Sequence, residues 1–128
     1  MYKFNLTTPK EGLYNITKEV KEAVYDSGVR DGLCVVYCPH TTAGITINEN
    51  ADDHVCTDIM FGLNKSFPNC EEFLHDEGNS SGHVKSSVVG VSQTLLIDRG
   101  ELVLGVWQNI FFAEFDPPRN RNFYVKII

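Results

Sequence analysis

The sequence lacks the features that would place it in several well-defined classes. Its 128 residues contain no Gly-x-Gly-x-x-Gly motif and no Walker-type phosphate loop, so neither nucleotide-binding motif is present. No run approaches the roughly 18 apolar residues that a membrane-spanning helix needs. No apolar segment of signal-peptide length follows Met1. We therefore expect a cytoplasmic protein without a membrane partner.

Positive charge is also scarce. The chain has 11 Lys and Arg against 17 Asp and Glu, which gives a formal net charge of -6. A protein that binds duplex nucleic acid needs Lys and Arg to displace the counterions of the phosphates. We therefore expect no nucleic-acid partner. A small anionic substrate remains compatible with this composition, because one local cationic pocket is enough to bind it.

The four cysteines form no Cys-x-x-Cys pair, which argues against a zinc knuckle. Cys34 and Cys38 face the same side of an apolar, strand-like run. We expect both to be buried, reduced thiols, since free Cys behaves as a small hydrophobe. Cys56 falls in a helical pattern and Cys70 in a loop, and neither has a neighbour that would activate a thiolate.

The length suits one domain over residues 1–128, with an ordinary hydrophobic content of 42%. Alternation or continuous apolar runs predict strands at 2–7, 33–38, 43–47, 94–97, 102–104, 107–115 and 122–128. The run at 33–38 is expected to be an interior strand covered on both faces. Helical spacing predicts helices from Asn15 to about Ser27, from Asn50 or Asp52 to about Leu63, and from His83 to Gly90. These elements predict a single compact α+β domain, with a mostly antiparallel sheet packed with a few helices.

Two polar stretches stand out from this pattern. The first, from His40 to Asp53, lies between hydrophobic segments. The second, from His75 to Ser87, holds two His, two carboxylates, one Lys and four Ser, with Val84 as its only aliphatic side chain. We expect the two stretches to meet in space and to form one site.

Three of the four histidines lie in these stretches, at His40, His75 and His83. Three neutral imidazoles with an open coordination position form a catalytic zinc-type site. The spacing itself matches no local metal motif, so a structural or surface role remains the alternative for each ring. His54 is expected to face solvent or the edge of the pocket.

Carboxylates accompany the histidines in both stretches. A metal-bound water or a substrate needs a proton acceptor nearby, so we expect at least one general acid or base among them. Glu49 ends a strand and is the strongest candidate in the first stretch. Asp52 is equally suited to the positive end of a helix dipole. Asp76 is the corresponding candidate in the second stretch.

An anion site is a third possibility. The amides of Ser80 to Gly82 lie at a predicted helix N-terminus, which attracts phosphate, although simple helix capping is the alternative. Other donors that could complete such a site are Lys85, Ser86, Ser87, Thr41, Thr42 and Arg119. Gln108 is a polar residue in an otherwise apolar strand, so its amide needs partners, and a pocket would supply them.

Three segments together resemble the secondary thiamine-phosphate synthase family, also called YjbQ-like. They are Pro39–Asp52, His75–Ser87 and Gly105–Ile110, in this order, and the resemblance covers nearly the whole chain. Ser92 to Ile110 also resembles the family signature, which ends in Gly-x-Trp-Gln. Val106 stands where that family usually has Thr or Ser, which removes one hydroxyl near Gln108.

The resemblance implies a compact α+β domain, usually assembled as a homotrimer. It implies a polar pocket in which the residues matching His40, His75 and His83 bind a metal. It also implies an activity, the joining of a pyrimidine diphosphate and a thiazole phosphate to give thiamine phosphate.

We therefore expect a transferase that acts on a small phosphorylated molecule, with a divalent metal, zinc first among the candidates, on the three histidines. The residues expected to act in catalysis are Glu49, Asp52, Asp76 and Lys85. Those expected to contact the substrate are Thr41, Thr42, Asn48, Ser86, Gln108 and Arg119. Two alternatives stay open: a metal-dependent hydrolase of a phosphoester or amide, and a non-enzymatic trimeric protein that binds a metal or anion.

Overall fold

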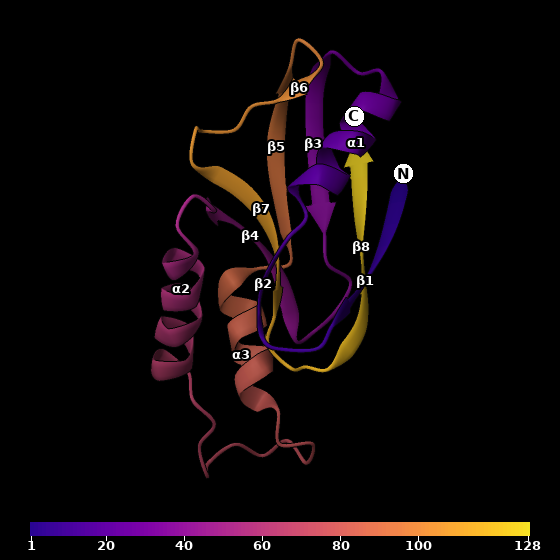
Figure 1. The fold of residues 1–128 in the computed structure, drawn as a ribbon. Helices are drawn as coiled ribbons and strands as arrows, with labels where there is room; N and C mark the ends of the chain where they lie inside the picture. The colour runs from indigo at the N-terminus through magenta and orange to yellow at the C-terminus, as the bar shows by residue number, and fades with distance from the viewer.

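Two antiparallel sheets organise the chain, and the computed structural model describes all residues from 1 to 128 (Figure 1). In chain order the elements are β1 (Tyr2–Thr8), β2 (Gly12–Asn15), α1 (Thr17–Ser27), β3 (Asp31–Tyr37), β4 (Ala43–Glu49), α2 (Asp53–Ser66), α3 (Ser80–Val89), β5 (Ser92–Asp98), β6 (Glu101–Leu102), β7 (Gln108–Glu114) and β8 (Arg119–Ile127). The larger sheet has the order β1-β8-β3-β5-β6 and the smaller one β2-β7-β4. This arrangement confirms the predicted α+β fold with antiparallel sheets.

The main core lies between the two sheets and α1. Its side chains come from alternate positions of the larger sheet, from the smaller sheet and from one face of α1, and include Val20, Val24, Cys34, Val36, Ile45, Leu95, Ile110, Phe112 and Phe123. The prediction that β3 is covered on both faces is wrong. Cys34 and Val36 point into the core, but Leu33 and Tyr37 on the other face are 40% and 44% exposed. Strand β3 is therefore half-buried, with one face in the core and the other exposed to solvent.

A second, smaller cluster covers the other face of the smaller sheet. Met60 of α2 packs there with Ala113 and Phe115, and Leu63 and Val89 lie against the same cluster. Strand β7 is thus enclosed between helices on one side and the main core on the other, which explains its continuous apolar run. Met60 is the only buried residue of α2, so this helix lies at the surface (Figure 1).

Some predicted boundaries are wrong by a few residues. Asn15 belongs to β2 and pairs with Phe111, so α1 begins only at Thr17, whose amide donates to the Asn15 side chain at 3.0 Å. Helix α3 begins at Ser80 rather than His83, because the amides of Gly82 and His83 already donate to the carbonyl of Asn79. The predicted cap of α2 is confirmed at Asp52, which accepts from the His54 amide at 2.9 Å.

All four cysteines are free. Burial raises the pKa of Cys34 and of Cys38 to about 11, as befits inert core thiols. None of the three helices has the length and apolar character needed to cross a membrane.

Candidate functional site

The two polar stretches meet where α3 lies against the start of β4, which confirms the prediction that they meet in space. The Ser86 hydroxyl donates to the carbonyl of Ala43 at 2.6 Å. Further along, the Ile45 amide donates to the carbonyl of Gly90 at 3.0 Å. A Cβ at Gly82 would lie 3.1 Å from the Phe115 carbonyl oxygen, which is a tight contact, and 3.5 Å from the Thr42 Cβ, which is an ordinary one. The absence of a side chain at Gly82 thus lets α3 approach the backbone that follows β7.

A cavity of about 530 Å³ opens at this junction. Its lining comes from the segment after β3, from α3 and from the turn that follows α3: His40, Thr41, His83, Ser86, Ser87, Gly90 and Val91. This volume is in the range of sites for small molecules. A larger hollow of about 900 Å³ runs along the exposed face of α1, but its lining is largely the charged and polar side chains of that helix face and none of the expected site residues.

His40 is held against the backbone of β8. Its Nε2 lies 3.0 Å from the backbone nitrogen of Asn122 and accepts a hydrogen bond from it when Nε2 carries no proton. When Nε2 is protonated, it donates instead to the backbone carbonyl oxygen of Asn122, at 3.1 Å. Burial and the nearby Arg121 guanidinium lower the pKa of His40 below its ordinary value of 6.5. The ring is therefore mainly neutral at pH 7 and fixed in orientation.

His75 and His83 form a pair at the start of α3. Their ring centroids are 5.2 Å apart and the ring planes are inclined by 86°. Two imidazoles on one tetrahedral zinc would have their centroids about 5 Å apart, so the separation suits two ligands of one ion. His75 also lies near Glu77, with its Nε2 4.0 Å from Oε2 of that carboxylate.

The complete three-histidine set is not assembled within one chain. No group of three or more His, Cys, Asp or Glu side chains lies close enough to hold a metal ion. His40 shares the cavity with His83, but its Nε2 is already bonded to the backbone of Asn122. A single chain therefore supplies a pair of candidate ligands, and a metal centre needs further donors.

Several expected residues lie at the other end of β4. Glu49 pairs with Gln108 across the small sheet, six positions beyond Ala43 along the strand. At about 3.3 Å per residue this is about 20 Å from the cavity end. Gln108 accepts from the Gly105 amide at 2.8 Å, Asn48 accepts from the Glu49 amide at 2.8 Å, and Asp52 caps α2. Within one chain these groups serve local structure and do not join His40 and His83.

Lys85 also faces away from the cavity. It is 5% exposed, and its ammonium donates to the side-chain oxygen Oδ1 of Asn64 in α2. The side-chain nitrogen Nδ2 of Asn64 in turn donates to Glu11 at 2.9 Å. Burial lowers the pKa of Lys85, while the charge of Glu11 acts in the opposite direction. The side chain therefore ties α3 to α2 instead of contacting a ligand in the cavity.

The remaining expected anion donors have partners within the chain. Arg119 donates to the carboxylate of Asp116 at 2.8 Å and to the Asp116 carbonyl at 3.0 Å. The Ser81 amide, in the first turn of α3, donates to the Asn69 side chain at 3.1 Å. The start of α3 is therefore capped from within the chain, and Asp76 lies exposed in the preceding loop. Thr41 and Ser87 lie exposed at the cavity, and the Ser87 hydroxyl already donates to the His83 carbonyl at 3.0 Å.

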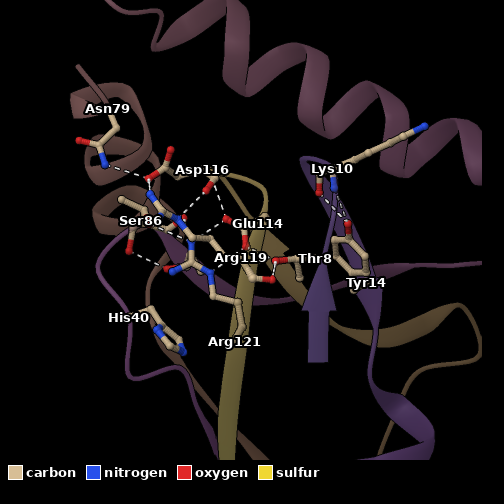
Figure 2. A network of polar contacts seen from close by, with 12 residues as sticks. Thr8, Lys10, Tyr14, His40, Asn79, Ser86, Glu114, Asp116, Arg119 and Arg121 are labelled. Atoms are coloured by element: carbon tan, nitrogen blue, oxygen red, sulfur yellow. Dashed lines mark hydrogen bonds and ion pairs between the residues drawn. The ribbon is translucent and has the colours of Figure 1, made fainter. Parts of the chain in front are cut away.

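The sequence reasoning missed the buried ion pair between Arg121 and Glu114 (Figure 2). Arg121 donates to both carboxylate oxygens, from Nε at 2.7 Å and from Nη2 at 2.6 Å. Burial alone would raise the pKa of Glu114, but the hydrogen bonds from Arg121 and Thr8 lower it below the ordinary range. The available signal was Glu114 itself, because a charged residue within an apolar strand requires a buried partner.

The chain is similar to known proteins over its whole length. The model of the family described as UPF0047 protein YjbQ-like matches residues 2–128. A UPF0047 protein of Methanocaldococcus jannaschii is 54% identical, over 100% of this chain and 94% of that protein. The UPF0047 protein YugU of Bacillus subtilis is 46% identical, over 95% and 93% of the two chains.

Solved structures have the same fold. The crystal structure of an uncharacterised YjbQ/UPF0047 protein from Clostridium acetobutylicum superposes with a TM-score of 0.97 at 52% identity and covers 100% of both chains. A protein of unknown function from Sulfolobus solfataricus has a TM-score of 0.94 at 29% identity, over 98% and 94% of the two chains. The names of these relatives specify no reaction.

Proposed function

The chain belongs to the UPF0047 YjbQ-like family, and on that premise we propose that it is a transferase acting on small phosphorylated substrates. The observation that carries the proposal is the cavity of about 530 Å³ in which His40 and Thr41 meet His83, Ser86 and Ser87. Imidazoles and hydroxyls donate hydrogen bonds to phosphate oxygens and exchange protons with a substrate. The size of the cavity favours a small molecule.

The specific reaction that we propose is the formation of thiamine phosphate. The thiazole nitrogen attacks the methylene carbon that bears the diphosphate of the pyrimidine substrate. A carbon–nitrogen bond forms, the carbon–oxygen bond breaks, and pyrophosphate leaves with the bonding electron pair. The site must therefore hold an anionic leaving group in line with the attacking nitrogen, since positioning is a large part of the rate enhancement in such displacements.

A single chain places no free positive charge at the cavity to neutralise the phosphate groups of the substrate. Lys85, Arg119 and Arg121 all donate to partners within the chain, so none is free to neutralise phosphate at the cavity. This supports the proposal of a divalent metal cofactor, with zinc first among the candidates and His75 and His83 as two of its ligands. Such an ion would neutralise phosphate charge. We propose a homotrimer as the assembly whose neighbouring chains supply the missing donors; sedimentation should then give three times the chain mass of 14.4 kDa.

Incubation of the purified protein with both thiamine precursors tests the reaction, in separate reactions with Zn²⁺, Mg²⁺ and Mn²⁺. We expect thiamine phosphate and an equal amount of pyrophosphate. His83→Ala should reduce the rate by about 100-fold, because it removes a proposed ligand of the metal ion. His54→Ala is the matched control, because this imidazole is exposed and lies only near Asp52.

The same experiment separates the alternatives. Absence of thiamine phosphate with every ion would overturn the proposal. Release of phosphate from a generic phosphoester without joining would indicate a hydrolase instead. A large loss of stability on metal removal, without any turnover, would indicate a binding protein.

A further inference from the structure

Two consecutive residues of β8 hold one wall of the cavity, formed by the segment from His40 to Thr42 that precedes β4. Arg121 donates from Nη2 to the Thr42 hydroxyl at 2.9 Å and to the Thr42 carbonyl at 3.3 Å. The backbone amide of the next residue, Asn122, donates a hydrogen bond to Nε2 of His40 at 3.0 Å. The segment from His40 to Thr42 is thus fastened at both ends to one strand. Thr41, between them, faces the cavity.

Arg121 is itself fixed by Glu114 of the neighbouring strand β7. The two-pronged contact of guanidinium and carboxylate determines the plane of both groups, which a Lys could not do. Glu114 is fully buried and also accepts from the Thr8 hydroxyl at 2.5 Å. With both groups removed from solvent, the Nη2 that reaches Thr42 has little freedom to move.

The Glu114 carboxylate is also connected by hydrogen bonds to α3, which forms the opposite wall of the cavity. Oε2 of Glu114 accepts from the Asp116 amide at 2.8 Å, and the Asp116 carboxylate accepts from the Asn79 side chain at 2.8 Å. Asn79 immediately precedes α3 and its carbonyl accepts from Gly82 in the first turn. Figure 2 shows this chain of contacts running from Arg121 through Glu114 and Asp116 to Asn79. One hydrogen-bonded network therefore links the segment that carries His40 with the helix that carries His83.

We propose that Arg121 and Glu114 form a positioning pair that fixes the His40–Thr42 wall of the cavity against α3 and thereby determines how tightly the cavity holds phosphate. The part that concerns phosphate rests on the proposed function. A buried ion pair contributes little net stability compared with apolar side chains of similar volume, so the consequence of this one is orientation rather than stability. Neither residue lines the cavity. Arg121 acts through Thr42, and Glu114 acts through Arg121 and Asp116.

Thr42→Val tests the proposal, because it removes the hydroxyl that accepts from Arg121 and keeps the branched side chain. The matched control is Thr8→Val, which removes a hydroxyl from the same Glu114 on the side of β1. Two amides report the position of the wall: Phe115, which donates to the Thr42 carbonyl at 3.1 Å, and Asn122, which donates to His40. Hydrogen exchange of both should become about tenfold faster in Thr42→Val and remain unchanged in Thr8→Val. Equal rates in the two variants would overturn the proposal.

Titration with inorganic phosphate supplies a readout that a merely structural role would not change. We expect the dissociation constant to rise about tenfold in Thr42→Val and by less than about twofold in Thr8→Val, with recovery in Thr42→Ser, which restores the hydroxyl. A folded Thr42→Val with wild-type affinity would contradict the positioning role. Absence of phosphate binding by the wild type would overturn the proposed function and the part of this inference that rests on it, whereas the exchange rates would still decide whether the pair positions the wall.

The double variant Glu114→Met/Arg121→Met removes the pair without leaving a lone buried charge. It leaves the Asp116 amide and the Thr8 hydroxyl without their Glu114 acceptor, so it should be less stable than the wild type, and it should show the same faster exchange at Phe115 and Asn122. Wild-type exchange in this variant would also overturn the inference.

Discussion

His75 and His83 approach each other edge to face, with ring centroids 5.2 Å apart and planes inclined by 86°. One ring belongs to the loop before α3 and the other to the helix itself. His40, although it shares the cavity with His83, is tied to the backbone of Asn122. We therefore expect substitution of His75 or His83 to affect metal affinity differently from substitution of His40.

Zinc titration by calorimetry should distinguish them. His75→Ala and His83→Ala should each weaken zinc binding by at least about tenfold, because each removes a proposed ligand. His40→Ala should change the affinity by less than about twofold. An equal loss in all three variants would instead indicate that His40 is a ligand in the assembled protein.

Glu114→Gln should destabilise the protein by about 3–5 kcal/mol at pH 7, since it leaves Arg121 buried without its counter-charge. Thermal or urea unfolding measures this loss. Glu101→Gln, at an exposed position of β6, is the control and should change little.

The same carboxylate predicts a dependence of stability on pH. Its folded-state pKa is lowered, so its contribution is fully present above the ordinary value of 4.5 and is lost as the pH falls through the lower, folded-state pKa. In Glu114→Gln the acid limb of the stability curve should be shallower. An unchanged acid limb would mean that Glu114 titrates alike in both states.

Lys85→Met should cost about 1–2 kcal/mol, because the side-chain oxygen of Asn64 loses its buried donor while the apolar stem is retained. Since the ammonium faces α2, the affinity for inorganic phosphate should be retained. Lys65→Met, at an exposed position of α2, is the control for stability. A large loss of phosphate affinity in Lys85→Met would mean that this lysine contacts the ligand after all.

Gly44→Ala should destabilise the junction between β4 and α3 by about 1–3 kcal/mol, the usual range for overpacking. A Cβ at this position would lie 2.5 Å from the Gly90 carbonyl oxygen, which is backbone and cannot swing aside. Gly62→Ala is the matched control, because nothing lies within 4 Å of its Cβ and the residue is inside α2. It should be neutral or stabilise by up to about 1 kcal/mol. Urea unfolding of both variants provides the comparison.

The fold was largely predictable because its strands carry clear patterns. The apolar run ending at Phe115 identified β7, and the alternation after Asn122 identified β8. The exposure of the outer face of β3 to solvent was not predictable, because Leu33 and Tyr37 are apolar yet exposed. An apolar side chain shows that burial is favourable, and only the tertiary structure shows whether a layer is present to provide it.

The candidate site was predictable in part. That the segments of His40 and His83 converge followed from their shared polarity, and the structure places both at one cavity. The direction of Lys85 did not follow, because Ser86 points to β4 while its neighbour one position earlier on the helix points to α2. The partnership of Glu114 and Arg121 depends on two strands being adjacent, and sequence patterns do not specify which arginine a buried carboxylate will meet.

The contact between Ile45 and Gly90 has a consequence for association with other chains. Strand β4 is an edge of the smaller sheet, and an edge normally offers unpaired amides and carbonyls on which another chain can align. Here the Ile45 amide is taken by Gly90, and its carbonyl accepts from the Gln93 side chain at 3.1 Å. The amide and carbonyl of Ile45 are thus unavailable to a further strand, and the turn that borders the cavity protects this part of the β4 edge from strand addition.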